Sequence, residues 1–196
     1  MQKNQNFKQK IMSTTETPHV CPVENAGMLE HNFRRKLQNP EKILQPYLKP
    51  GMTALDVGCG PGYFTFAMSE LVGKEGKVIA ADLQQGMLDI IEKKIGLGLG
   101  LGNIHTQLCN TDTIVVKEKV DFALCFYMVH EVPDRKSLLK EVAGLLNPGG
   151  TLLIVEPKIH VNKKAFNELL TEIEETGLKI SGEAKVFFSR GVVCKR

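Results

Sequence analysis

Four short apolar runs, separated by segments with a helical pattern, most strongly limit the fold of this chain. The runs are TALDV (53–57), KVIAAD (77–82), DFALCF (121–126) and TLLIVE (151–156). Each run is continuous rather than alternating, as in parallel strands that are covered on both faces. Strands that alternate with helices predict an α/β fold with a doubly wound, mostly parallel sheet.

The remaining segments supply helices and a last pair of strands. A short helix is expected to begin after Asn39, whose side chain caps it, with Pro40 as its first residue, and the segment closes at Pro50-Gly51. The tail LKISGEAKVFFSRGVVC has two β-rich runs separated by Gly182 to Ala184, which predict an antiparallel hairpin. Apolar stripes at helical spacing predict further helices within residues 64–72, 87–95, 138–146 and 165–177.

The composition is typical of one globular domain. Its 25 Lys and Arg against 22 Asp and Glu are too balanced and too scattered to indicate a nucleic-acid surface or a polybasic membrane patch. The five cysteines form no CxxC pair and no cluster with zinc-ligand spacing, so we expect free thiols in a reducing cytoplasm and no metal.

The N-terminus is polar and lacks the apolar run of a signal peptide. Nothing later approaches the length of apolar chain needed to cross a bilayer, so we expect no integral membrane association. We therefore predict a mobile tail over residues 1–20 and a single cytoplasmic domain over residues 21–196.

Two glycine-rich stretches compete for the role of ligand-binding loop. GLGLGLG (96–102) follows an expected helix and precedes the expected strand IHTQL, so it is interpreted as a flexible connection. LDVGCGPG (55–62) has the opposite order, with a strand that leads through glycines into a helix N-terminus. Only this second order lets free helix N–H groups face a nucleotide-like ligand.

An acidic residue at the end of the second run supports a ligand that contains adenosine. Asp82 follows Gly62 by twenty residues, at the place where a carboxylate accepts both ribose hydroxyls. The structural alternative is an acid that only caps the next segment. Because the glycines lie upstream, the two features together predict an adenosine-bearing ligand.

Four segments, taken in order, resemble the successive motifs of class I S-adenosylmethionine-dependent methyltransferases. They are LDVGCGPG, VIAADLQQGML, DFALCFYMVHEVPD and LLNPGGTLLIVEP, and they cover about residues 40–157. The resemblance is strongest to small single-domain members similar to the quinone-biosynthesis C-methyltransferases (methyltransferase type 11). It implies a seven-stranded sheet in the order 3-2-1-4-5-7-6, helices on both faces, an antiparallel C-terminal strand and S-adenosylmethionine as cofactor.

The resemblance also implies roles for individual residues. Asp56 and the backbone of Gly58 to Gly62 are expected to hold the methionine part of the cofactor, Asp82 the ribose and Leu83 one face of the adenine. Many relatives carry an Asp-Ala pair where this chain has Cys109 and Asn110, so the contact to the adenine edge is left to a backbone N–H at Asn110. The expected cofactor-binding set is Asp56, Gly58, Cys59, Gly60, Gly62, Tyr63, Phe64, Asp82, Leu83, Cys109, Asn110 and Tyr127.

The fourth strand should carry the groups that act on the methyl acceptor. Methyl transfer from a sulfonium is an in-line displacement, to which alignment in a dry pocket contributes much, although a neutral acceptor needs a base as well. The segment FYMVHEVPD lies at the carboxyl edge of the sheet, so Tyr127, His130 and Glu131 are expected to face the acceptor. His130 and Glu131 are the catalytic candidates, with a loop hydrogen bond and a surface ion pair as their structural alternatives. Asp134 is expected to cap the next helix.

Other side chains are candidates for the rim of the same site. In relatives the segment before the core covers the substrate, so we expect an N-terminal cap over residues 21–50. Metalloid methyltransferases with a similar core use several cysteines, and an approach of Cys21 to Cys109 would be needed for that chemistry. The rim candidates are Glu156, His160, Arg190, Cys21, His31, Arg34 and Arg35, among which Arg190 suits an acidic acceptor.

The sequence therefore predicts methyl transfer to a small-molecule acceptor. The segment CFYMVHEV lacks the Asn/Asp-Pro-Pro-Tyr motif of base-amino methyltransferases, and the balanced charge argues against tight RNA binding. Two alternatives stay open. One is a nicotinamide-dependent oxidoreductase of Rossmann type, against which the missing third glycine of GxGxxG counts; the other is a non-catalytic module that only binds S-adenosylmethionine.

Overall fold

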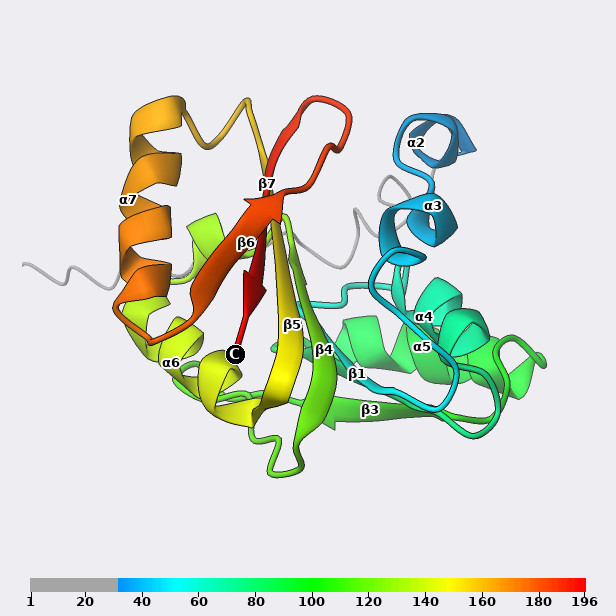
Figure 1. The fold of residues 1–196 in the computed structure, drawn as a ribbon. Coiled ribbons are helices and arrows are strands. Elements are labelled where there is room, and N and C mark those ends of the chain that lie inside the picture. Colours follow the sequence, from blue (N-terminus) through cyan, green and yellow to red (C-terminus); the bar gives the residue numbers. More distant parts are fainter. Residues whose placement is uncertain (1–31) are drawn as a thin grey trace, which may run out of the picture.

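The computed structural model describes residues 32–196, which form one seven-stranded sheet with helices on both faces (Figure 1). The strand order is β3-β2-β1-β4-β5-β7-β6, as predicted. The strands are β1 Thr53–Val57, β2 Lys77–Asp82, β3 Ile104–Leu108, β4 Val120–Phe126, β5 Leu146–Pro157, β6 Lys179–Glu183 and β7 Ser189–Lys195. The helices are α2 Asn32–Leu37, α3 Pro40–Leu44, α4 Thr65–Val72, α5 Gln85–Gly96, the 3-10 turn η2 Val129–Glu131, α6 Arg135–Leu145 and α7 Lys163–Glu174.

The first five strands are parallel, and β7 runs antiparallel to both of its neighbours. Because successive residues of a strand face opposite sides of the sheet, the apolar runs feed two cores. In Figure 1, α6 and α7 lie on one side of the sheet, whereas α3, α4 and α5 lie on the other. The first core joins Leu55, Ala123 and Leu152 to Leu139 and Leu169; the second joins Ala54, Phe122 and Leu153 to Leu44 and Met68.

The hairpin turn lies later in the chain than predicted. Gly182 and Glu183 pair with Val193 and Val192, so they belong to β6. The connection between β6 and β7 is instead formed by residues 184–188, which we call the β6–β7 loop. The apolar character of KVFF made it resemble a strand, but it forms this loop.

A short helix and a glycine-rich connection lie where the sequence predicted them. The first helical residue of α3 is Pro40, the Asn39 side chain accepts a hydrogen bond from Lys42 N at 2.8 Å, and the helix ends before Pro46. GLGLGLG links the end of α5 to β3, at the amino edge of the parallel strands. The expected tail over residues 1–20 and the first part of the cap lie outside the described residues. No helix within the described part of the chain is long and apolar enough to span a membrane.

The order of the strands creates a crevice above β1 and β4. From β1 the chain moves outward through β2 and β3 and then returns to β4, on the other side of β1. Loops at the carboxyl ends of these two strands therefore turn away from each other, and ligands of doubly wound sheets bind in the space between them.

Candidate functional site

The glycine turn after β1 has a backbone that other residues rarely adopt. Gly58, Gly60 and Gly62 have φ angles of 65°, 53° and 90°, in the left-handed region that favours glycine. The N–H groups of Gly58 and Cys59 donate to Ala81 O, at 2.8 and 3.1 Å. These bonds hold the turn against the end of β2, and so beside Asp82.

Asp82 fixes the other side of the turn through its carboxylate. Its Oδ2 accepts from Gly60 N and its Oδ1 from Gln84 N, both at 2.9 Å. Burial raises the pKa of this carboxyl. The Leu83 N–H also interacts favourably with this carboxylate. A carboxylate offers about four lone-pair positions, so the three backbone groups leave capacity for a ribose hydroxyl. The ribose-binding role of Asp82 stays a prediction.

Two adjoining cavities lie at this edge of the sheet, and we name them after the groups that the sequence analysis expects there. The adenine-side cavity, of about 230 Å³, extends between the loop after β3 and the start of α6. The acceptor-side cavity, of about 360 Å³, extends between the glycine turn, η2 and the end of β5. Both are lined by Gly58, Asp82, Met128 and Glu131. Gly58 leaves no spare room, because a Cβ placed on it would lie 3.0 Å from Met128 Cβ.

The structure brings together thirteen of the fourteen predicted site residues around these cavities. Leu83, Cys109 and Asn110 line the adenine side, and Gly58, Asp82 and Glu131 line both. Gly62 lines neither cavity. It lies instead between α4 and α5, where a Cβ would meet Phe66 at 2.9 Å and Ile91 at 3.0 Å. Its lack of a side chain serves the packing of α4 against α5. The remaining acceptor-side residues are Asp56, Cys59, Gly60, Tyr63, Phe64, Tyr127 and His130.

The loop after β3 is held by its own hydrogen bonds. The N–H of Asn110, which we expected to serve the adenine edge, donates to Thr113 O at 2.9 Å. Glu141 of α6 accepts from Thr113 Oγ1 at 2.7 Å and from Ile114 N at 3.0 Å. The expected backbone donor is therefore engaged in this structure, and the Asn110 side chain is exposed at the cavity rim.

Asp56 lies at the buried base of the glycine turn. It is 2% exposed, and Thr65 Oγ1 donates to its Oδ2 at 2.7 Å. Burial is the main cause that raises the pKa of Asp56, to about 7. This carboxyl ties β1 to the first turn of α4.

His130 forms a close pair with a fully buried acid. Its Nδ1 lies 2.5 Å from Glu156 Oε2, and Glu156 is 0% exposed. The other carboxylate oxygen accepts from Val129 N at 2.9 Å and from His130 N at 3.3 Å. The hydrogen bond to Glu156 is the main cause that raises the pKa of His130. The ring also stacks on His160, with centroids 5.4 Å apart.

An aromatic wall of Tyr63, Phe64, Phe126 and Tyr127 lines part of the acceptor-side cavity. The Arg34 guanidinium lies 4.3 Å from the centre of the Tyr63 ring and 5.8 Å from that of Tyr127. Gln38, which follows α2, donates to Tyr127 Oη at 2.5 Å and accepts at its backbone carbonyl from Tyr63 Oη at 3.0 Å. Arg34, in the middle of the expected cap, thus lines the cavity, and Gln38 supports two of its aromatic residues.

The remaining sequence candidates are a helix cap, an arginine of a separate groove and side chains outside the described part of the chain. Asp134 caps α6 as predicted, accepting from Ser137 N at 2.9 Å. Arg190 donates to Val161 O at 3.1 Å and lines a separate groove, so its predicted position at the acceptor mouth is wrong. Cys21 and His31 lie outside the described residues, as does the side chain of Arg35, and an approach of Cys21 to Cys109 is not tested.

Sequence reasoning missed three contributors. Met128 lines both cavities, and Gln38 links α2 to the aromatic wall. Glu156 was expected only at the rim, not as a partner of His130. Its signal was present, because a charged residue that ends a buried strand at the carboxyl edge needs a partner.

Comparison with known proteins identifies the family of this chain. The model of a methyltransferase domain family matches residues 48–186. A demethylmenaquinone methyltransferase of Bacillus cereus is 31% identical over 124 residues, which are 63% of this chain and 52% of that protein. The one from Lactobacillus johnsonii is 32% identical over 148 residues, 73% of this chain and 58% of the relative. The chain thus spans about half the length of these relatives.

A solved structure matches over most of both chains. The SAM-dependent methyltransferase from Aquifex aeolicus is 28% identical, with a TM-score of 0.80 over 89% of this chain and 98% of the other. The family match favours the methyltransferase prediction over the nicotinamide alternative. This chain belongs to the methyltransferase domain family, within the class I S-adenosylmethionine-dependent methyltransferases.

Proposed function

We propose that the protein transfers a methyl group from S-adenosylmethionine to a small, flat, largely apolar acceptor that carries an ionisable hydroxyl. The observation that carries this proposal is the pair of His130 and buried Glu156, which opens on the same cavity as the glycine turn. A base at that place is needed only if the acceptor must lose a proton.

The cofactor would be held by the glycine turn and Asp82. Asp82 would accept the ribose hydroxyls, Leu83 would cover the adenine, and the turn from Gly58 to Gly60 would face the methionine part. When bound, S-adenosylmethionine supplies an electrophilic methyl on a sulfonium. The contribution of the chain is to fix this group in a crevice that excludes water.

His130 would remove the acceptor proton through Nε2. Because the Glu156 carboxylate accepts a hydrogen bond, it favours the tautomer with hydrogen on Nδ1 and leaves the lone pair on Nε2. The raised pKa of His130 makes it a stronger base than a free imidazole. The proton would pass from the acceptor hydroxyl to Nε2, and the resulting electron-rich acceptor would form its bond to the methyl group in line as the methyl–sulfur bond breaks and S-adenosylhomocysteine leaves with the electron pair.

The walls of the acceptor-side cavity favour a flat ring. Tyr63, Phe126, Tyr127 and Met128 offer apolar and aromatic surface, and the Arg34 cation lies among these rings. Aromatic walls with one cation suit an aromatic hydroxyl compound whose anion is stabilised. The names of the relatives from Bacillus cereus and Lactobacillus johnsonii, both demethylmenaquinone methyltransferases, are compatible with this class.

The test begins with calorimetric titration by S-adenosylmethionine, S-adenosylhomocysteine and NAD. We expect binding of the two adenosyl-sulfur ligands and none of NAD. Transfer of a labelled methyl group is then measured with a panel of hydroquinones, phenols, thiols and amines. His130→Ala should lower turnover with unchanged cofactor affinity, whereas His105→Ala, at an exposed position on β3, serves as the matched control. Cofactor binding without transfer to any hydroxyl acceptor would favour the non-catalytic alternative.

A further inference from the structure

We propose that the carboxyl edge of the sheet docks on an anionic phospholipid bilayer through an exposed apolar rim. The rim consists of Ile159, Phe187 and Phe188, which are 75%, 56% and 61% exposed. Soluble domains seldom expose several large apolar side chains together unless the patch binds something. This inference concerns a surface and stands independently of the acceptor chemistry.

The three side chains come from two loops that are joined by a hydrogen bond. Lys158 N donates to Phe188 O at 3.2 Å, which places the segment of Ile159 beside the β6–β7 loop. On its other side the loop is fixed by Gln38 Nε2, which donates to Phe187 O at 3.3 Å. Phe188 has a φ of 52°, which is unfavourable for a bulky side chain. The backbone is thus held in place while both phenyl rings stay outside.

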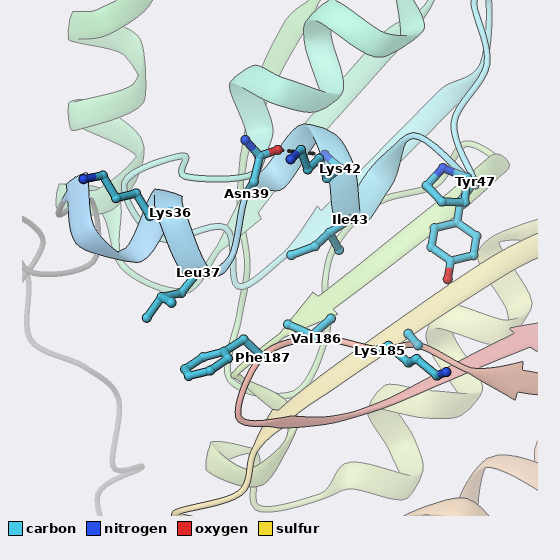
Figure 2. A pocket seen from close by; sticks show the side chains of 11 residues that line it. Lys36, Leu37, Asn39, Lys42, Ile43, Tyr47, Lys185, Val186 and Phe187 are labelled. Carbon is cyan, nitrogen blue, oxygen red and sulfur yellow. Dashed lines mark hydrogen bonds between the residues drawn. The ribbon is translucent and has the colours of Figure 1, made fainter.

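Positively charged grooves flank the rim on both sides. Figure 2 shows one of them, where Lys36 and Lys42 of the α2–α3 segment lie across from Lys185 and Phe187 of the loop. The second groove, beyond the loop, is lined by Lys158, Lys163, Lys185 and Arg190. Among the residues that line these two grooves, Glu183 is the one acid.

This arrangement has the chemistry of a peripheral membrane surface. Aromatic side chains enter the boundary between headgroups and acyl chains, and nearby lysines attract anionic headgroups. The sequence predicted no such patch because its charges are scattered along the chain. Folding brings Lys36 and Lys42 beside the loop of Lys185, more than 140 positions away.

The rim also adjoins the mouth of the proposed site. Ile159 lines the acceptor-side cavity and is exposed, and Tyr127 Oη lies 2.5 Å from Ser189 Oγ, directly after the loop. A bilayer that contacts the rim would therefore face the cavity opening. An apolar acceptor dissolved in the membrane could then enter without crossing water.

The experiment is co-sedimentation of the full chain with phosphatidylcholine vesicles that contain either no phosphatidylglycerol or about one third of it. No cofactor or acceptor is present, so the result does not depend on methyl transfer. We expect partitioning to the anionic vesicles to be about tenfold stronger, and to be weakened by about 0.5 M salt. Phe187→Ser with Phe188→Ser should lower partitioning by about tenfold or more.

The matched control replaces two exposed leucines at the opposite edge of the sheet. Leu97→Ser with Leu99→Ser should leave vesicle binding unchanged, because GLGLGLG precedes β3 at the amino edge. Equal partitioning of the wild type and the phenylalanine variant, or no binding to anionic vesicles, would overturn the proposal. A concentration-dependent dimer that the phenylalanine variant abolishes, without vesicle binding, would assign the rim to self-association and overturn it as well.

Discussion

Replacing Glu156 by Gln should separate the chemistry of His130 from its position. Glu156 accepts hydrogen bonds from Val129 N, His130 N and His130 Nδ1. Glutamine has nearly the same shape, and its oxygen retains the two backbone bonds. Its NH₂ group then faces Nδ1, so the imidazole must take the other tautomer, with hydrogen on Nε2. The lone pair that would remove the acceptor proton is lost.

The size of the effect follows from the role of each bond. General-base catalysis contributes about 10² to 10⁴ in rate, so we expect kcat to fall by about 10²-fold or more. Because the amide still bonds the ring and the backbone, the free energy of unfolding should fall by only about 1 to 2 kcal/mol. Affinity for S-adenosylmethionine should be unchanged, since Asp82 and the glycine turn are untouched.

The pH dependence supplies a readout that a purely structural role would not move. Glu156 is the main cause that raises the pKa of His130, so wild-type kcat should rise with pH through a value above 6.5, where the basic form appears. Glu131 and His160 also face this ring, and Glu131 acts in the same direction. In Glu156→Gln the remaining activity should rise at lower pH, because the raising charge is gone.

The assay is a kcat profile between about pH 5 and 9, combined with ¹⁵N NMR of the imidazole to identify the tautomer. Glu118→Gln is the control, since this acid pairs with Lys77 at the surface. A Glu156→Gln enzyme with wild-type kcat and an unshifted pH profile would refute His130 as the base. A loss of kcat with the wild-type tautomer would refute the role of Glu156 in setting that tautomer.

Three further predictions concern the cofactor loop. Asp82→Ala should weaken S-adenosylmethionine binding by about 1 to 3 kcal/mol in calorimetry, and Asp89→Ala on α5 should not; equal affinities would remove Asp82 from the site. Gly62→Ala should destabilise the fold by about 1 to 3 kcal/mol more than Gly102→Ala in urea unfolding. Both positions have positive φ, but only Gly62 would meet other side chains. The folded-state pKa of Asp56 is raised to about 7. The free energy of unfolding of the wild type, measured relative to Asp56→Asn, should therefore fall as pH rises from about 4 to about 7. A difference that does not change with pH would contradict the raised pKa.

The fold could be predicted because its signals are local. Continuous apolar runs identify covered strands, and the glycines of LDVGCGPG mark the turn that a ligand approaches. The β6–β7 loop was placed too early because Val186, Phe187 and Phe188 have the composition of a strand. The phenyl rings of Phe187 and Phe188 face outward, whereas Val186 is buried in the second core. Composition alone does not distinguish the two cases.

Parts of the site could not be predicted because they depend on contacts between distant segments. Sequence order indicated that His130 and Glu156 would both lie at the carboxyl edge of the sheet. Only the register of β4 against β5 places the Glu156 carboxylate beside the His130 ring. Gln38 reaches Tyr127 across 89 positions, and no motif marks that bond. Asn110 illustrates the opposite error, since its backbone N–H has an acceptor within its own loop.

The strand order also explains how one edge can serve two molecules. The residues that fit the cofactor, Gly58 and Asp82, follow β1 and end β2, on one side of the switch point. Those proposed to act on the acceptor, His130 and Glu156, follow β4 and lie near the end of β5, on the other side. Since adjacent strands are about 5 Å apart, the two sets lie one to three strand spacings from each other. A doubly wound sheet therefore places the proposed base beside the cofactor pocket without a second domain, and substitutions of His130 or Glu156 should alter acceptor turnover while leaving the affinity for S-adenosylmethionine, measured by calorimetric titration, unchanged.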